Sequence, residues 1–461
     1  MEVNPFWPSF AVDPRKTESG WSPLISEFLQ RASDEFEDRF PRSGSSWPSA
    51  KERQRSQPLF LLGSRSSGGG ITTAIGTLFR LLEGKALPVY IRPFRNPSAP
   101  WKALLRAFGE QLILPDRPRA LHPWPEEPSR IRVFANDILG ALASRLVNLG
   151  RIRDSRLRSA VRFFRRHPTK VLLEGLVPEW AQWLRQDFAR IVPAAEELLS
   201  QLGLWEEDLQ NWLWAIHGLA VRIEDRVVQE ACRRWIFGEP VDWAQAIRAN
   251  LTVAPREEAA EPPEDENGLS RRRIEDLLRL SRLSKPFLLA FDNADAWGVE
   301  RPLAESAGRL LETLCESPPT FLLLGAHLGR WESSVLPFWS EKQRGLLSPP
   351  LLLREIETSE AATFLKERIT RFSGSRVRLR PDWIEGVYQG ANSLPARTLL
   401  LCCAVQWNRE RSVDQQPSSI ATRSFLDAKL QWEMFGPNLP YRWIVEWALL
   451  PPEPPADFGW G

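Results

Sequence analysis

"LFLLGSRSSGGGITTAIGTLFRLL", residues 59–82, decides the fold of this chain. An apolar run over residues 58–63, typical of a buried strand, leads into a Gly-rich turn. The turn leads into an amphipathic helix over residues 72–83, and a second strand pattern, "LPVYIRPF", follows at residues 87–94. Strand, loop, helix and strand at this spacing predict a βαβ unit, and therefore a parallel sheet.

The Gly-rich turn has the composition of a phosphate-binding loop. Its glycines let backbone N–H groups point at an anion, and the start of the helix adds a partial positive charge. On the pattern G-x-x-x-x-G-K-[ST], one register takes Gly63 and Gly68 as the two glycines, with Gly69 in the lysine slot and Gly70 in the hydroxyl slot. A tight turn without a ligand is the alternative, because such loops also match by chance.

A second register is preferred because it puts a hydroxyl at the start of the helix. Gly70 is then the second glycine, Ile71 stands in the lysine slot, and Thr72 is the magnesium-binding hydroxyl. Neither register contains the lysine that reaches the β- and γ-phosphates, so that charge is absent unless Arg65 replaces part of it. The predicted nucleotide-binding residues are Arg65, Ser67, Gly68, Gly69, Gly70, Thr72 and Thr73.

A second motif, "FLLAFDNAD", spans residues 287–295. A buried strand that ends in an acid is the Walker B pattern, which brings a carboxylate to the carboxyl edge of the sheet where Mg²⁺ is held. Asp292 is the metal candidate together with Thr72, and Asn293 stands where a catalytic Glu is usual. An amide cannot act as a general base, so Asp295 is the nearby substitute. A polar turn after a strand is the alternative, since Asp and Asn favour turns.

Two further polar residues follow predicted elements at sensor-like positions. His327 comes just past the strand "TFLLLGAHLG", and Arg397 lies in the turn "GANSLPARTLL". Together with Asp295 they are the candidate catalytic residues. A surface histidine and a solvated arginine are the alternatives.

The chain is predicted to be an α/β protein, a parallel-sheet P-loop NTPase core interrupted by helices and closed by a helical lid. The expected parts are residues 1–57, a helical segment and linker; 58–98, the first part of the core; 99–268, a helical insertion ending in an acidic linker; 269–353, the second part of the core; and 354–461, a helical lid and tail.

The order of these motifs resembles the AAA+ and STAND group of P-loop ATPases, nearest the origin-recognition and transposition-regulator type. The resemblance covers residues 58–94 and 280–406, with both nucleotide motifs degraded. It implies ATP or ADP with Mg²⁺ as the ligand, either retained or lost, and assembly with partner proteins or with further copies. The segment "ACRRWIFGEPVDWAQAIRANL", residues 231–251, is similar to a segment in ATPases of BREX-type phage-defence systems.

A basic stretch, "RIRDSRLRSAVRFFRRHPTK", spans residues 151–170. On a helix most of its basic side chains fall on one side, where they could bind the phosphates of DNA or RNA. A solvated helix face is the alternative. The candidate nucleic-acid or partner-binding residues are Arg158, Arg162, Arg165, Arg166 and Lys170.

Net charge, cysteine content and apolar runs restrict the partners and the cellular location that can be expected. The net charge is +2, so any nucleic-acid contact must be local. Four cysteines without a C-x-x-C pair fit a reducing cytoplasm and argue against a structural zinc site. The N-terminus lacks the pattern of a signal peptide, and no apolar run reaches about 18 residues, so a cytoplasmic location without membrane association is expected.

Three functions remain open from the sequence. The first is a degenerate ATP-binding subunit of a DNA-linked assembly, such as phage defence or a mobile element, which binds nucleotide but hydrolyses it poorly. The second is a pseudo-ATPase adaptor that binds partner proteins without nucleotide. The third is an active ATPase in which Arg65, or a residue from a neighbouring subunit, supplies the missing charge.

Overall fold

The computed structural model describes most of the chain in two units. The first unit ends at Glu355, and the second begins at Ile356. The described residues are 22–40, 59–65, 69–114, 129–152, 158, 178–222, 224–252, 266–316, 320–373, 381–388 and 391–412.

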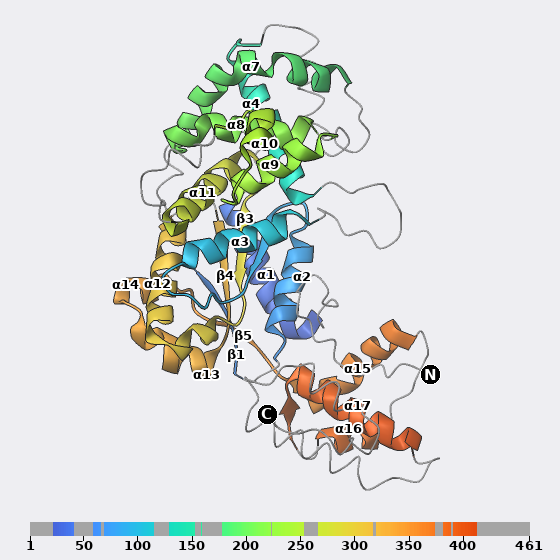
Figure 1. The fold of residues 1–461 in the computed structure, drawn as a ribbon. Helices are drawn as coiled ribbons and strands as arrows, with labels where there is room; N and C mark the ends of the chain where they lie inside the picture. Colours follow the sequence, from blue (N-terminus) through green and yellow to red (C-terminus); the bar gives the residue numbers. More distant parts are fainter. Residues whose placement is uncertain are drawn as a thin grey trace, which may run out of the picture. The chain divides into compact units, whose positions relative to one another are not determined.

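The first unit is built on a five-stranded parallel sheet (Figure 1). Its strand order is β2-β3-β4-β1-β5, and every neighbouring pair is parallel. The strands are β1 (Phe60–Ser64), β2 (Leu87–Ile91), β3 (Phe287–Phe291), β4 (Thr320–His327) and β5 (Leu351–Leu353). Four of them are nearly continuous buried runs, as strands covered on both faces should be. The predicted α/β class with a parallel sheet is confirmed.

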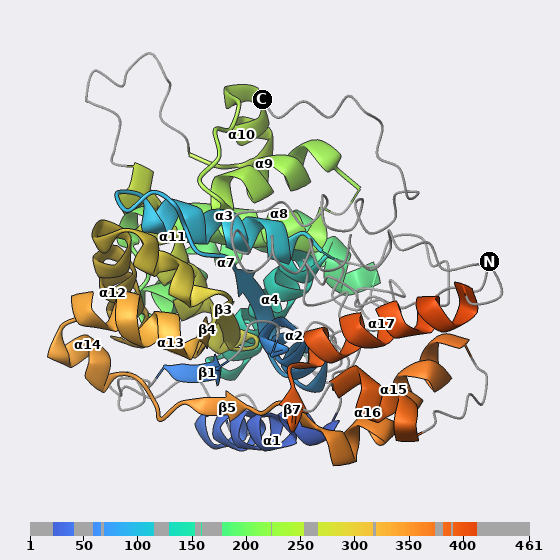
Figure 2. The ribbon, with the colours of Figure 1, turned by 90° about the horizontal axis from the view of Figure 1, so that it is seen from below.

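Helices cover both faces of the sheet. One face packs against α1 (Ser22–Arg39) and α2 (Ile71–Leu81). The other packs against α3 (Pro100–Leu112), α11 (Glu266–Leu280) and α12 (Arg301–Glu316). Figure 2 shows α1 on one side of the strands, with α3 and α11 on the opposite side.

Neighbouring strands β1 and β4 send their following segments to opposite faces. The chain leaves β1 through α2, which packs with α1 on one face of the sheet. It leaves β4 through α13 (Leu328–Arg330) and a turn containing Trp331 and Val335, which pack on the other face with α3, α11 and α12. Ligands of open α/β sheets bind beyond the carboxyl ends of the strands at such a switch point. Arg65 after β1 and Gly70 before α2 lie at this edge.

Between β2 and β3 the described chain is helical, as the periodicity of this region predicted. The helices are α3, α4 (Arg130–Asn148), α7 (Pro178–Ser200), a 3₁₀ turn η3 (Glu206–Asp208), α8 (Leu209–Val221), α9 (Arg226–Ile236), α10 (Trp243–Ala249) and α11. They share one continuous apolar cluster with the sheet face, so they are packed onto the core rather than separate from it.

A buried ionic cluster joins α11 to η3 and α8. The Asp276 carboxylate is fully buried and accepts hydrogen bonds from Trp212 Nε1 at 2.8 Å and Arg279 Nη1 at 3.2 Å. Arg273 pairs with Asp208 at 2.7 Å, and its guanidinium lies 3.7 Å from the centre of the Trp235 ring. A buried charge is costly unless a group of opposite charge lies beside it, and Asp276 and Arg273 each have such a partner.

The second unit is a small helical assembly with one two-stranded ribbon. β6 (Ile356–Glu357) pairs antiparallel with β7 (Ser393–Leu394). The helices are α15 (Thr358–Ser373), α16 (Pro381–Tyr388) and α17 (Ala396–Ser412). The Tyr388 hydroxyl donates a hydrogen bond to the carbonyl of Ile356 at 3.1 Å, which ties α16 to the ribbon.

Gly63 lies inside β1, where its missing side chain makes room for a neighbour. A Cβ at this position would lie 2.5–2.7 Å from three carbon atoms of the buried Leu328 side chain. We expect Gly63→Ala to lower the free energy of unfolding by about 2 kcal/mol, since overpacking a rigid sheet costs roughly 1–3 kcal/mol. Urea denaturation measures this change.

Gly345 provides the matched control. It ends helix α14 (Glu341–Gly345), and a Cβ there would meet nothing within 4 Å. Gly345→Ala should leave stability unchanged or raise it slightly, because alanine restricts the unfolded chain more than glycine does. If both alanine variants unfold at the same urea concentration, Gly63 has no packing role.

Candidate functional site

The carboxylate of Asp292 gathers residues from three elements at the carboxyl edge of the sheet. It is only 1% exposed. Thr72 Oγ1 donates a hydrogen bond to its Oδ2 at 2.6 Å, and the Tyr90 hydroxyl donates to the same oxygen at 2.8 Å. The backbone N–H of Asn293 donates to Oδ1 at 2.9 Å. Asp292 therefore links β3 to β2 and to the start of α2.

Local backbone structure puts these groups in reach of one another. Asp292 follows β3 directly, and its N–H donates to the carbonyl of Ile91 at 3.0 Å, which extends the parallel ladder by one step. Thr72 is the second residue of α2. Tyr90 lies on the face of β2 that packs against the cluster containing α2. Asp292 and Thr72, proposed from the sequence as a metal-binding pair, are thus brought together.

Gly70 precedes α2 in a left-handed conformation with a φ of 91°. L-residues with a side chain rarely adopt this conformation, so the turn favours glycine here. Among the described residues, no atom lies within 4 Å of a Cβ built on Gly70. The N-terminus of a helix is a place where free backbone N–H groups can bind an anion.

Ile71, in the lysine slot of the preferred register, packs against the sheet. A Cβ added to Gly325 of β4 would lie 2.5 Å from Ile71 Cγ2 and 3.3 Å from Asp292 Oδ1. Glycine at position 325 therefore leaves the room that the isoleucine side chain occupies. At the position where a phosphate-binding loop has its lysine, this chain has an isoleucine that makes a hydrophobic contact with the sheet.

Burial sets the electrostatics of the cluster. It raises the pKa of Asp292, and the hydrogen bonds from Thr72, Tyr90 and Asn293 oppose that rise. Burial and the neighbouring Asp292 charge raise the pKa of Tyr90 well above its usual value. Arg92, the residue after β2, forms a hydrogen bond with the Tyr90 hydroxyl and opposes that rise.

The other candidates near this edge have structural partners. Asp295 Oδ1 accepts the backbone N–H of His327 at 3.0 Å, which ties the end of β4 to the turn after β3. His327 Nδ1 accepts the N–H of Arg330 at 3.4 Å and caps α13. Asn293 has a left-handed φ of 57°, and its side chain is exposed.

The remaining predicted residues are placed only in part. Arg65 is exposed just after β1, and Gly69 and Thr73 are half-buried near the start of α2. Arg158 is exposed. Arg397 lies on α17 in the second unit, and its side chain is outside the described residues. Ser67, Gly68, Arg162, Arg165, Arg166 and Lys170 are also outside the described residues.

Sequence analysis missed Tyr90 and Arg92. Both belong to "LPVYIRPF", which was interpreted only as a strand rich in β-branched and aromatic residues. One signal was present, because polar groups at the carboxyl end of a parallel strand next to an acid-bearing strand lie at the ligand edge. The register pairs Tyr90 with Ala290, two residues before Asp292.

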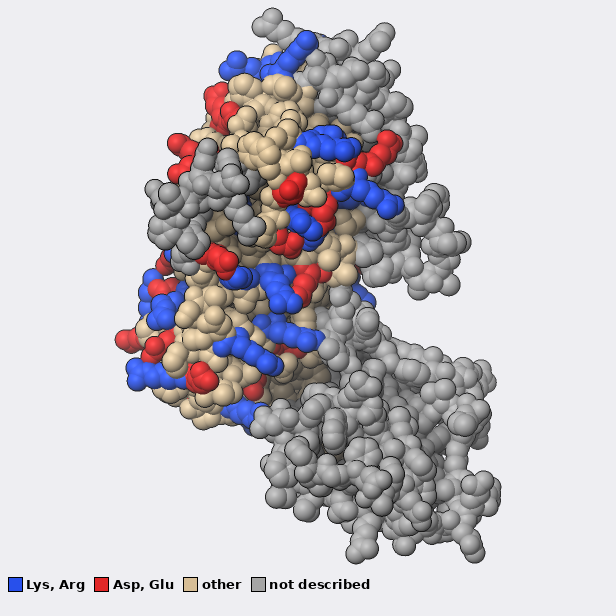
Figure 3. Space-filling model, viewed as in Figure 1, with Lys and Arg blue, Asp and Glu red and all other residues tan. Residues whose placement is uncertain are grey.

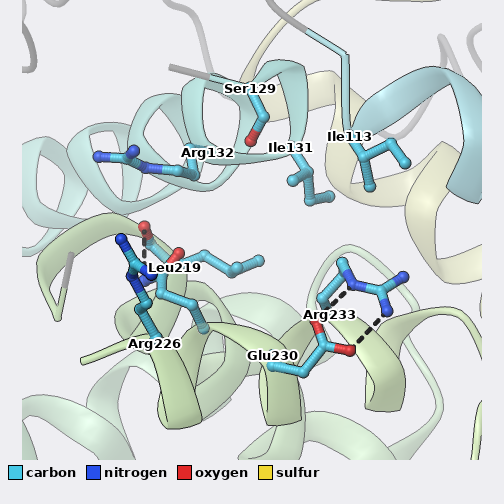
Figure 4. Close-up of a pocket in the computed structure, with 9 residues that line it drawn as sticks. Ile113, Ser129, Ile131, Arg132, Leu219, Arg226, Glu230 and Arg233 are labelled. Atoms are coloured by element: carbon cyan, nitrogen blue, oxygen red, sulfur yellow. Dashed lines mark hydrogen bonds and ion pairs between the residues drawn. The ribbon is translucent and has the colours of Figure 1, made fainter. Parts of the chain in front are cut away.

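A pocket of about 280 Å³ lies among the helices between β2 and β3 (Figure 4). Figure 4 shows Arg233 joined to Glu230 by two interactions, at 2.7 and 2.9 Å. Gln229 Nε2 donates to the carbonyls of Gly218 and Leu219 near the end of α8. These polar groups serve the packing of α9. The lining residues are Ile113, Ser129, Ile131, Arg132, Leu219, Arg226, Gln229, Glu230 and Arg233.

The segment 231–251 also carries structural contacts. Trp235 is buried under the Arg273 guanidinium, and Glu239 pairs with Arg233 at 3.3 Å. Asp242 caps α10 by accepting the N–H of Ala244 at 3.1 Å. Trp235 therefore joins α9 to α11, and the other two contacts are local to the end of α9 and the start of α10.

The surface carries both signs of charge. On the face shown in Figure 3, Lys and Arg side chains are interspersed with Asp and Glu side chains over the described part. No helix in the described ranges has the length and apolar character needed to cross a membrane. Among the same residues, no group of three or more His, Cys, Asp or Glu side chains is placed to hold a metal ion.

The Thr72–Asp292 pair has the right chemistry for Mg²⁺, but hydrogen bonds compete for the Asp292 oxygens. Hydroxyl and carboxylate oxygens are the ligands that this ion prefers. Each oxygen of a carboxylate has two lone pairs: both on Oδ2 are used by the Thr72 and Tyr90 hydroxyls, and one on Oδ1 is used by the N–H of Asn293. Since Asp292 is also almost fully buried, a magnesium ion at Oδ2 would have to displace one of these two hydroxyls.

Comparisons with protein-family models, with curated proteins and with solved structures found no match for this chain. The fold and the site define its class as an α/β protein with a parallel sheet, compatible with a P-loop-like core.

Proposed function

We propose that this chain is a degenerate AAA+/STAND-like P-loop subunit that binds ATP or ADP but hydrolyses it poorly. One observation carries the proposal. A 2.6 Å hydrogen bond joins Thr72 and Asp292, residues 220 positions apart, at the switch point of the sheet. These are the hydroxyl and the acid that the two nucleotide motifs contribute to a P-loop site.

Binding and hydrolysis make different demands on the site. Backbone N–H groups at the start of α2 can hold phosphate without any side-chain charge. Hydrolysis also needs positive charge on the transferred phosphoryl group and a residue that activates water. Ile71 and Asn293 supply neither, which supports binding without efficient turnover.

The wider role that we propose is in a DNA-linked assembly, in phage defence or a mobile element. The similarity of residues 231–251 to a defence-system segment and the basic stretch at residues 151–170 support it. Because positive charge is local in this chain, any DNA contact would be made by that stretch rather than by the whole surface.

A pseudo-ATPase adaptor is the second candidate, and a specific observation favours it. Asp292 has all its hydrogen bonds inside the fold, and Ile71 packs into the space over Gly325. A P-loop fold kept only as a scaffold for partner proteins would have these contacts.

Calorimetry with ADP and ATP tests the proposal. We expect wild-type binding with a dissociation constant on the order of tens of micromolar. Ile71→Lys should tighten it by about tenfold, because the ammonium group adds a charge-assisted contact to phosphate. Leu81→Lys is the control, since it adds the same charge to the exposed last residue of α2, away from the loop.

Two outcomes decide between the candidates. If neither ATP nor ADP gives a heat of binding at high micromolar protein and ligand, the nucleotide-binding proposal is wrong and the adaptor remains. Turnover gained by the double variant Ile71→Lys, Asn293→Glu would show that the site is intact but disabled, whereas turnover by the wild type would exclude the adaptor.

A further inference from the structure

The hydroxyls of Thr72 and Tyr90 donate to the same oxygen of Asp292, but they differ in whether a lone pair remains free for a metal ion. A hydroxyl has one proton to donate and two lone pairs. Thr72 can therefore donate to Asp292 and still offer a lone pair to a metal ion. The Tyr90 oxygen donates to Asp292 and also accepts a hydrogen bond from Arg92. Tyr90 thus takes the second lone pair of Oδ2 and is itself engaged with a cation.

Arg92 adds a positive charge next to the Tyr90 hydroxyl. It follows β2 directly, and its charge and its hydrogen bond to the Tyr90 hydroxyl lower the pKa of that phenol, so the guanidinium lies beside Tyr90. A buried carboxylate loses its hydrogen bonds to water, which is costly in free energy. The hydrogen bond from the Tyr90 phenol, strengthened by the nearby guanidinium, offsets part of this cost. A divalent cation at the same place would have to displace the phenol and lie near a permanent positive charge.

We propose that Tyr90, backed by Arg92, fills the cation position on Asp292, so that this site takes nucleotide without Mg²⁺. The proposal rests on nucleotide binding at the start of α2. Tyr90 on β2 would then compensate the charge of Asp292, as a bound metal ion would otherwise do.

Calorimetric titration of ADP in excess Mg²⁺ and in EDTA tests this assignment. The wild type should bind ADP with affinities within about twofold of each other in the two buffers. Tyr90→Phe keeps the ring and removes the hydroxyl, which frees a lone pair of Oδ2. This variant should bind ADP about tenfold more tightly in Mg²⁺ than in EDTA.

Tyr388→Phe is the matched control. It removes a tyrosine hydroxyl that bonds to the Ile356 carbonyl in the second unit, so its ADP binding should match the wild type in both buffers. Arg92→Met is a second variant at an exposed position, which keeps the test available if Tyr90→Phe does not fold. It should show a Mg²⁺ dependence between those of the wild type and Tyr90→Phe.

The outcomes separate this proposal from the proposed function. Mg²⁺-dependent binding by the wild type, or a Tyr90→Phe variant without Mg²⁺ dependence while the wild type binds, overturns the role of Tyr90 and leaves nucleotide binding standing. If only Tyr90→Phe binds, and only with Mg²⁺, the wild type is not a nucleotide-binding protein but Tyr90 does fill the cation position. Binding by neither protein overturns both.

Discussion

Asp292→Ala is expected to lower the free energy of unfolding by about 4 kcal/mol. The substitution removes the acceptor for two hydroxyls and one backbone N–H, and each donor left unsatisfied costs roughly 1–3 kcal/mol. The loss of an unfavourably buried charge offsets part of this cost, since burial raises the pKa of Asp292. Urea denaturation followed by tryptophan fluorescence measures the net effect.

Two variants make the measurement specific. Asp295→Ala removes a half-buried carboxylate that accepts one backbone N–H at 3.0 Å, and it should cost only about 1 kcal/mol. Asp292→Asn keeps an acceptor for the hydroxyls and should fall between the two alanine variants. An Asp292→Ala protein as stable as the wild type would show that the cluster does not tie α2 and β2 to β3.

The sheet could be predicted because its strands are encoded locally. Parallel strands covered on both faces are continuous apolar runs, so 58–63 and 287–291 stand out without any knowledge of their partners. Strand ends were less well defined. The sequence predicted a strand that continues to Phe94, but the ladder ends at Ile91. Hydrogen-bond partners, rather than composition, set that boundary.

The site could be predicted only where a motif fixes the position. Thr72 and Asp292 each stand in a recognisable pattern, and the structure brings them together. Tyr90 has no motif, because its role depends on the register of β2 against β3. The contact of Ile71 with Gly325 depends in the same way on where β4 lies beside β1. Gly63, a candidate for the phosphate turn, instead makes room for Leu328 inside the sheet.

The contacts of Ile71 and Tyr90 stabilise the fold at the place where the nucleotide site is proposed. Ile71 Cγ2 occupies the space that a side chain on Gly325 would need. The acid that would face a metal is satisfied by Tyr90. Both contacts are made within the protein, so the fold does not depend on a ligand for them.

The stability of this protein is expected to depend on pH through Asp276. Burial raises the pKa of this carboxyl from its usual 3.8 to about 6, although Trp212, Arg279 and the N–H of Trp205 oppose the rise. The folded chain therefore holds a proton between about pH 4 and pH 6 that the unfolded chain releases. The resulting stabilisation is complete below pH 4 and is lost as pH rises through 6. A rise of roughly two pKa units corresponds to about 3 kcal/mol.

Comparison with Asp276→Asn isolates this contribution from other carboxyl groups, such as Glu230, whose pKa is lowered to about 2 by its hydrogen bonds from Arg233. The asparagine keeps an acceptor for Trp212 Nε1 and has no proton to release. The stability of the wild type relative to this variant should therefore fall by about 3 kcal/mol between pH 4 and pH 7. Glu275→Gln removes a neighbouring charge on α11 that also pairs with Arg279, and serves as the control. Because the desolvation of Asp276 is what the experiment detects, a difference that stays constant with pH would mean that water reaches this carboxylate.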